Sequence, residues 1–338
     1  MNLRFKLAAI LAGSISISAN AVSGEELSVA TFVPPSHETI TGALAWFENE
    51  LTSRSNGELT LKVYAAGQLG AGPTQQYKRA VEGVADITFG IAASTPTLFP
   101  KTMLAILPGK ALDGPDSTRR MWTVFDKYMA DEWSDVKVLA VGNPAGGMII
   151  ATKDVSTIEG MKGTKIVPWA AITTPVLQGM GAVPVQLDPT EHYTALSTGT
   201  IDAAISSINN IMPPWNLDEV ANYAVVNTPA TFNPVFYVMN KERYESLSAK
   251  HQKIIDEISG MPFSMQLVQA FHDADEVALK WKDEKIAAGE LNVEWIVTSD
   301  RERAKMEAAA AAGMEAIYSD YADRGIQNAQ TIYEALNK

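Results

Sequence analysis

Hydrophobic positions in the first third of the chain follow two periods in turn, one typical of strands and one typical of helices. Strand-like stretches have apolar side chains at every second position or in short apolar runs. Helix-like stretches place them three and four positions apart and end at glycine. The predicted order is strand 27–33, helix 39–54, strand 59–64, helix 73–82 and strand 85–91. This alternation is typical of parallel βαβ units.

The same alternation begins again after two further strands, predicted at 136–141 and 147–152, which flank the turn at residues 143–146. It consists of strands at 164–167, 183–187 and 203–207 and helices at 174–180 and 190–198. Two α/β segments joined by extended chain predict two lobes connected by β-strand hinges. Residues 248–288 are helical in pattern, interrupted only near Gly260, so this element is long enough to lie along both lobes. Residues 300–338 are expected to form closing helices.

The first 21 residues have the pattern of a signal peptide. Arg4 and Lys6 precede an apolar run at 7–17, and Ala19-Asn20-Ala21 has the spacing of a cleavage site. The run is shorter than the roughly 20 apolar residues that span a bilayer. We therefore expect a mature chain that begins at Val22 and is exported to the periplasm.

Composition and charge narrow the possible functions. The 338 residues include no cysteine, which excludes disulfides, thiolate metal sites and thiol nucleophiles. The formal net charge of −12 becomes −14 without residues 1–21, which contain two basic residues and no acidic one. Such a chain repels nucleic acid. No later segment approaches 18 uncharged apolar residues, so we expect a protein that is not embedded in a membrane.

Motifs for catalysis are missing from the sequence. It contains no HExxH, GxSxG or GxxxxGK[ST] pattern, and its four histidines are scattered. Acidic residues on the late helices, Asp275 among them, lie near lysines and are expected on solvated, ion-paired faces. The sequence therefore predicts no enzyme activity, no metal and no cofactor.

Several segments together resemble one family, the DctP-type solute receptors of tripartite ATP-independent periplasmic (TRAP) transporters. They are residues 53–59 (SRSNGEL) with 67–70 (GQLG), 81–87 (VEGVADI), 160–166 (GMKGTKI), 181–185 (GAVPV), 193–202 (YTALSTGTID) and 219–223 (EVANY). The segments occur in the order that the family shows, and the resemblance covers nearly all of the mature chain.

The resemblance implies a two-lobed periplasmic binding protein fold with a long helix spanning both lobes. The family's crossover pattern implies a lobe I of residues 22–144 plus about 232–272. Lobe II would then contain 145–231 plus about 273–338. A small solute is expected to bind in the cleft between the lobes, and the closed receptor would deliver it to the permease subunits of an ion-gradient-driven TRAP transporter.

Two features of the family are missing at the expected positions. Most relatives bind organic acids through an arginine in the pattern Lys, apolar, Arg, apolar, Pro. This chain passes directly from Lys165-Ile166 to Val167-Pro168, so the arginine is deleted. A second family arginine is matched here by Met148. Because a buried, unpaired carboxylate costs several kcal/mol, the loss of both anchors favours a pocket with apolar and aromatic walls.

Candidate ligand-binding residues follow from the same comparison with the family. They are Trp169, Met148, Phe89, Val33, Ile91, Ser206, Asn209, Phe232 and Trp215. Ser206 and Asn209 or its neighbour Asn210 would supply the few hydrogen-bonding groups. Such a pocket suits an aromatic or otherwise apolar solute better than a C4-dicarboxylate or a sugar acid.

Other ligand classes remain as alternatives. Trp169 and other aromatic residues could bind a small amine by cation–π contact, and Glu38 would favour a cationic solute if it reaches the cleft. An organic acid could instead be held by a relocated cation, with Arg119, Arg120, Lys110 or Lys165 as candidates. Two alternatives lie outside the class of transport receptors. A secreted enzyme would turn over its bound solute, and a sensory binding protein would lack permease genes near its own gene.

Overall fold

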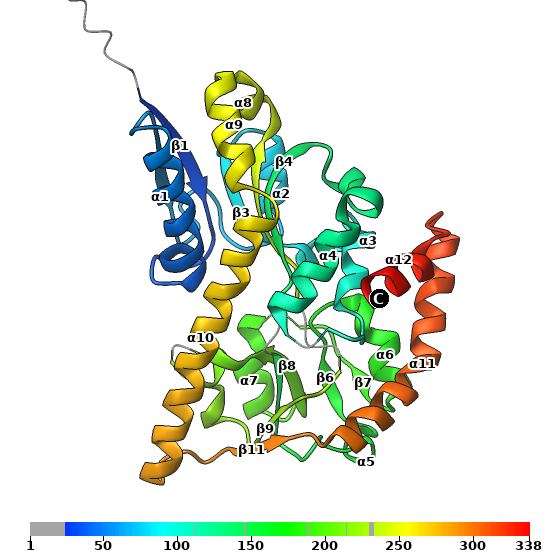
Figure 1. The fold of residues 1–338 in the computed structure, drawn as a ribbon. Coiled ribbons are helices and arrows are strands. Elements are labelled where there is room, and N and C mark those ends of the chain that lie inside the picture. Colours follow the sequence, from blue (N-terminus) through cyan, green and yellow to red (C-terminus); the bar gives the residue numbers. More distant parts are fainter. Residues whose placement is uncertain (1–23, 112, 145–146, 188, 214, 230–232) are drawn as a thin grey trace, which may run out of the picture.

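The computed structural model describes residues 24–338 except 112, 145–146, 188, 214 and 230–232 (Figure 1). The predicted signal peptide therefore lies outside the described residues. The protein consists of two lobes, each built on one β-sheet with helices on its faces. This arrangement confirms the predicted α/β, two-lobed fold.

Lobe I is built on a five-stranded sheet with one antiparallel strand. Its order is β2 (Leu59–Tyr64), β1 (Glu25–Ala30), β3 (Ile87–Ile91), β10 (Val235–Asn240) and β4 (Val136–Gly142). Strands β1, β2, β3 and β4 run in the same direction, and β10 is antiparallel to both of its neighbours. The four parallel strands agree closely with the sequence prediction, whereas β10 was not predicted.

Lobe II is built on a six-stranded sheet. Its order is β11 (Glu294–Val297), β9 (Tyr223–Val226), β5 (Gly147–Ala151), β8 (Ala203–Ser207), β6 (Lys165–Val167) and β7 (Val183–Pro184). Only β5 runs against the other strands of this sheet, as its antiparallel pairing with β8 and β9 shows. Strands β9 and β11 were not predicted from the sequence.

Helices cover both faces of each sheet. They are α1 (Ala45–Arg54), α2 (Gln76–Val81), α3 (Pro100–Met103), α4 (Gly114–Tyr128), α5 (Ile158–Met161), α6 (Thr174–Gly179), α7 (His192–Ser197), α8 (Lys241–Ser246), α9 (Ala249–Ile258), α10 (Met261–Ala288), α11 (Asp300–Asp323) and α12 (Ala329–Leu336). Shorter helical turns of other types include the π-helical η1 (Thr39–Leu44) and the 3-10 helices η3 (Leu104–Ile106) and η7 (Ile208–Ile211). Helix α12 packs on α4 and η3, so the end of the chain lies against lobe I elements.

Helix α10 is the longest element and lies along both lobes (Figure 1). Its 28 residues span about 42 Å at 1.5 Å per residue. It packs against β4, α4 and η1 of lobe I and against η7 of lobe II. Gly260, in a left-handed conformation with φ 72°, separates it from α9, at the interruption expected from the sequence. The prediction of a long helix spanning both lobes is confirmed.

Aromatic side chains fill the core on both faces of the lobe I sheet. On one face, Phe89, Tyr237 and Phe263 pack with ring centroids 5.1 Å apart in each successive pair. On the other face, the Phe236 ring lies 5.3 Å from Trp133. Gly90 on β3 makes room for Phe236, since a Cβ atom at Gly90 would lie 2.2 Å from that ring. The strand that carries Phe89 and Ile91 is thus held rigidly between two aromatic layers.

Candidate functional site

The ends of the parallel strands place the candidate residues on facing edges of the two sheets. In lobe I, segments 31–38, 65–73, 92–99 and 143–144 all follow strands that end at one edge. In lobe II, segments 168–173, 185–187 and 207–213 follow strands in the same way. Strand β5 begins only a few residues after β4 ends, so these two edges face each other. Ligands of open α/β sheets bind at such carboxyl edges.

Phe89 is buried behind two side chains that lie nearer the edge. Phe89 is 1% exposed, and the partly exposed Phe32 stacks on it with ring centroids 5.7 Å apart. His37 lies 6.4 Å from Phe89 and 6.1 Å from Phe271 of α10. The structure therefore places Phe32, rather than Phe89, at the outer side of this aromatic layer.

Val33 and Ile91 belong to the same hydrophobic core as Phe89. Val33 is 6% exposed, and Ile91 is partly buried against that core. Three candidate residues from two strand ends of lobe I are thus brought together. Whether they touch a solute stays a prediction.

Met148 and Ser206 are direct neighbours in the lobe II sheet. They pair in register on β5 and β8, at the edge that faces lobe I. Met148 is fully buried in the core, and the buried Ser206 hydroxyl accepts a hydrogen bond of 2.9 Å from Asn210 Nδ2. Asn210 thus positions the hydroxyl of Ser206 at the end of β8.

The remaining aromatic candidates differ in their surroundings. Trp169 follows β6 and is partly buried against the core, and its indole Nε1 is buried without a hydrogen-bond partner among the described residues. Trp215 is 41% exposed. Phe232 lies outside the described residues. Of these three, Trp169 has a buried donor that a solute could use.

Asn209 connects the two lobes through Glu38. Its Nδ2 donates to Glu38 Oε1 at 3.4 Å, and its backbone N–H faces the carboxyl of Asp275 on α10. Glu38 immediately precedes η1 and Asn209 lies in η7, and both of these turns pack on α10. We call Glu38, Asn209 and Asp275 the junction cluster. It shows that Glu38 reaches the region between the lobes.

Burial changes the acidity of the groups around this cluster. Burial, with a smaller contribution from the nearby Glu38 carboxylate, raises the pKa of Asp275 to about 8, against the lowering effect of the Asn209 backbone N–H. The pKa of Glu38 is also raised by burial, against the lowering effect of its hydrogen bonds. Burial lowers the pKa of His37 to about 4, so His37 is neutral at pH 7. At neutral pH the junction cluster therefore holds a proton on its carboxyls, whereas two solvent-exposed carboxyls would both be ionised.

Sequence reasoning missed Phe32, Phe271 and Asp275. Asp275 was expected on a solvated, ion-paired face, and this was wrong because η1 and η7 cover that face of α10. Phe271 and Asp275 are four residues apart and thus share one side of the helix, which is the signal that could have indicated their common environment.

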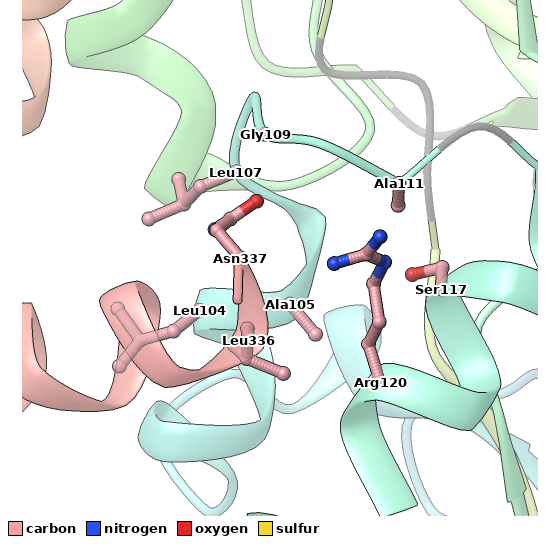
Figure 2. A pocket seen from close by; sticks show the side chains of 9 residues that line it. All are labelled: Leu104, Ala105, Leu107, Gly109, Ala111, Ser117, Arg120, Leu336 and Asn337. Atoms are coloured by element: carbon pink, nitrogen blue, oxygen red, sulfur yellow. The ribbon is translucent and has the colours of Figure 1, made fainter. Parts of the chain in front are cut away.

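Whether a relocated cation reaches a solute stays a prediction. Arg119 and Arg120 of α4 follow Ser117 and Thr118, whose hydroxyls accept hydrogen bonds from Asn143 just after β4. Arg119 and Lys165 are exposed. Arg120 is ion-paired with Asp116 at 2.8 Å and lines a narrow cavity with Ser117 and Asn337 (Figure 2). The strand-end segments named above contain no lysine or arginine. A guanidinium from another element does reach them: Arg79 of α2 donates from Nη2 to the carbonyl of Ala71 at 3.3 Å, and its Nη1 is buried without a hydrogen-bond partner among the described residues.

In the part of the chain that the structure describes, no three His, Cys, Asp or Glu residues are grouped so that they could hold a metal ion. None of the described helices is long and apolar enough to cross a membrane.

Comparisons with known proteins agree with the fold. Residues 29–320 match the family described as bacterial extracellular solute-binding protein, family 7 (DctP). The chain is 25% identical to the outer membrane transporter protein TsaT of Comamonas testosteroni, over 99% of this chain and 98% of that protein.

Two solved structures are similar over the whole fold. A marine metagenome TRAP solute-binding protein specific for aromatic acid ligands is 26% identical, with a TM-score of 0.82 over 92% of this chain and 97% of that chain. A TRAP solute-binding protein of Rhodoferax ferrireducens T118, in complex with copurified benzoate, is 25% identical. Its TM-score is 0.81 over 93% of this chain and 96% of that chain.

The family match covers most of the chain. This protein therefore belongs to the DctP family of bacterial extracellular solute-binding proteins. It is a solute-binding receptor of the TRAP type, not an enzyme.

Proposed function

We propose that this member of the DctP family captures a small aromatic solute between its lobes and delivers it to the membrane permease of a TRAP transporter. The observation that carries the proposal is the pair of similar structures, 25% and 26% identical over almost the whole chain, whose ligands are aromatic acids. The aromatic layer of Phe32 and Phe89 at the lobe I edge supports it. An aromatic ring stacks favourably on such a surface.

The proposed binding surface joins residues from both facing edges. Lobe I would contribute Phe32 in front of Phe89, with Val33 and Ile91 beside them. Lobe II would contribute Trp169, Trp215 and the Met148–Ser206 pair, with Asn209 at the junction. Phe232, outside the described residues, remains part of the proposal.

The polar group of the solute would be held by neutral donors instead of the family's two arginines. The indole Nε1 of Trp169 is buried and unpartnered, and the strand-end segments have no lysine or arginine. A solute with two carboxylates would leave at least one of them poorly compensated, at a cost of several kcal/mol. C4-dicarboxylates and sugar acids are thus disfavoured.

Transport would follow from closure of the lobes on the solute. A solute that touches both edges stabilises the closed state by its differential affinity for it. The permease would recognise that closed state. The receptor would act in the periplasm after cleavage of the signal peptide behind Ala21.

A thermal-shift screen of ligand-stripped residues 22–338 tests the proposal. The panels are aromatic acids, neutral aromatic compounds, small amines, C4-dicarboxylates and hexuronates. A ligand at 100 times its Kd stabilises the protein by about 2.7 kcal/mol, which raises the melting temperature measurably. We expect shifts in the aromatic panels. Shifts confined to the dicarboxylates, hexuronates or amines would overturn the proposed solute class.

A matched pair of variants then tests the place of binding. Phe32→Leu removes the ring at the front of the aromatic layer and should weaken an aromatic hit by about 1 kcal/mol, roughly fivefold in Kd. Val277→Ala changes a side chain that is 59% exposed on α10 and should leave Kd unchanged. Equal affinities of Phe32→Leu and the natural protein would remove Phe32 from the site.

A further inference from the structure

The junction cluster contains more hydrogen-bond acceptors than donors. Glu38 accepts from its own backbone N–H and, at Oε1, from Asn209 Nδ2, and Asp275 faces the backbone N–H of Asn209, so Asn209 contributes a donor to each carboxyl. Asn209 Oδ1 is itself a buried acceptor without a partner among the described residues. Two carboxyls in this arrangement are stable only if a proton is added.

The surrounding groups do not neutralise these carboxyls. His37 Nδ1 lies 3.4 Å from Glu38 Oε2 but accepts the backbone N–H of Thr39, so it is not a donor in the neutral ring. The Tyr237 hydroxyl donates to the carbonyl of Thr39. Among the described residues, no lysine or arginine is ion-paired with Glu38 or Asp275.

Within one helical turn of Asp275, α10 carries no lysine or arginine. Asp273 and Glu276 are exposed and acidic, and Glu276 raises the pKa of Asp275 slightly. His272 is also exposed on α10. Asn209 and Asn210 of η7 carry no charge. The lysines of α10, Lys280, Lys282 and Lys285, lie more than one turn farther along the helix.

The contact between Glu38 and Asn209 joins segments that belong to different lobes. Glu38 follows β1 of lobe I, Asn209 follows β8 of lobe II, and α10 lies against both (Figure 1). If the lobes separate, Asn209 leaves Glu38, Asp275 stays beside Asn209 in lobe II, and water reaches both carboxyls. Hydrated carboxyls return to their ordinary acidity and release the proton.

We propose that the junction cluster of Glu38, Asn209 and Asp275 couples closure of the lobes to uptake of about one proton, so that the receptor closes more readily at low pH. This coupling would regulate the proposed solute site. Only the predicted effect of pH on solute affinity rests on the proposed function. The closure equilibrium of the empty protein is affected in the same way.

The sign of the effect follows from linkage. Carboxyls that bind a proton more tightly in the closed state favour closure at low pH, and this contribution is lost as the pH rises through the closed-state pKa. For Asp275 that value is about 8 and the ordinary value is about 4, so the contribution falls from about pH 4 to about pH 8, and measurements from pH 6 to pH 9 cover the upper part of this change. A simple aromatic acid has a pKa near ~4 and keeps its charge throughout the measured interval.

Distance measurements on the solute-free protein test the coupling directly. The natural chain has no cysteine, so Glu82→Cys on lobe I and Glu159→Cys on lobe II, both exposed, provide the only labelling sites. Energy transfer between the two labels is measured from pH 6 to pH 9. We expect the distance to increase with pH as the lobes open.

Two variants separate the cluster from general effects of pH. Asp275→Asn removes the titrating carboxyl and should make the distance independent of pH. Asp273→Asn, on an exposed side chain two residues away, should behave as the natural protein does. A distance independent of pH in the natural protein, or a pH dependence that persists in Asp275→Asn, would overturn the proposal.

Benzoate serves as the probe for the effect on affinity. Its Kd should increase about tenfold or more between pH 6 and pH 8 in the natural protein and change little in Asp275→Asn. If benzoate and the other aromatic compounds fail to bind, the proposed solute is wrong, while the label distances still decide the coupling. If benzoate binds with the same Kd at both pH values, the coupling is wrong and the proposed solute stands.

Discussion

Replacing Gly90 by alanine should destabilise lobe I, because β3 has no room for a methyl group at this position. The added Cβ would lie 2.2, 2.7 and 2.9 Å from three atoms of the Phe236 ring. That ring is 1% exposed and lies 5.9 Å from Phe99 and 5.3 Å from Trp133, so it has little space to move away. Overpacking of this kind costs about 1–3 kcal/mol, and we expect a value near the upper end.

Urea unfolding followed by tryptophan fluorescence measures this loss in the free energy of unfolding. The double variant Gly90→Ala with Phe236→Leu provides the control, since the smaller side chain leaves space for the methyl group. The two substitutions should cost less together than the sum of their separate effects. A Gly90→Ala protein within about 0.5 kcal/mol of the natural one would show that the Phe236 ring is not fixed as described, and would refute the reasoning.

Three further predictions concern a buried carboxyl, the solute and the hinge. Burial raises the pKa of Glu132 to about 7, so its contribution to stability is lost as the pH rises from about 4.5 through 7. Denaturation at pH 5 and pH 8 should show this loss, at most ~3 kcal/mol, in the natural protein and not in Glu132→Gln. Trp169→Ala should weaken an aromatic ligand by about 1–3 kcal/mol in calorimetric titration, and an unchanged Kd would exclude Trp169 from the site. Asn143→Ala removes two hydrogen bonds, from Nδ2 to the Ala105 carbonyl and to the Ser117 hydroxyl, and should lower the free energy of unfolding by about 1–3 kcal/mol. Loss of less than 0.5 kcal/mol would show that water replaces both bonds.

Much of the fold could be predicted from local pattern. The strands at 59–64 and 203–207 have the predicted bounds, because short apolar or alternating runs between turn residues determine them. The interruption at Gly260 was also visible, since glycine with a positive φ separates two helices. Strand β10 was missed, although its sequence VFYVMN is fully buried, because a short apolar run does not distinguish strand from helix.

The candidate site was less accessible to prediction because its contacts are distant in sequence. Glu38 and Asn209 are 171 residues apart, and no local pattern indicates that they meet. The environment of Asp275 is set by η1 and η7, whereas its neighbours in the sequence suggested a solvated face. The burial of Phe89 behind Phe32 depends likewise on how the end of β1 passes β3.

The position of β10 in the lobe I sheet has a consequence for how the chain folds. This strand is formed by residues 235–240, yet it lies between β3 and β4 and pairs with both. A nascent or partly exported chain that ends before residue 235 therefore has two unpaired sheet edges, which are prone to aggregation. Pairings over such long sequence separations are slow to form. We expect lobe I to fold only after residues 145–231 of lobe II have emerged, so the chain would remain unfolded long enough to be exported as an extended polypeptide.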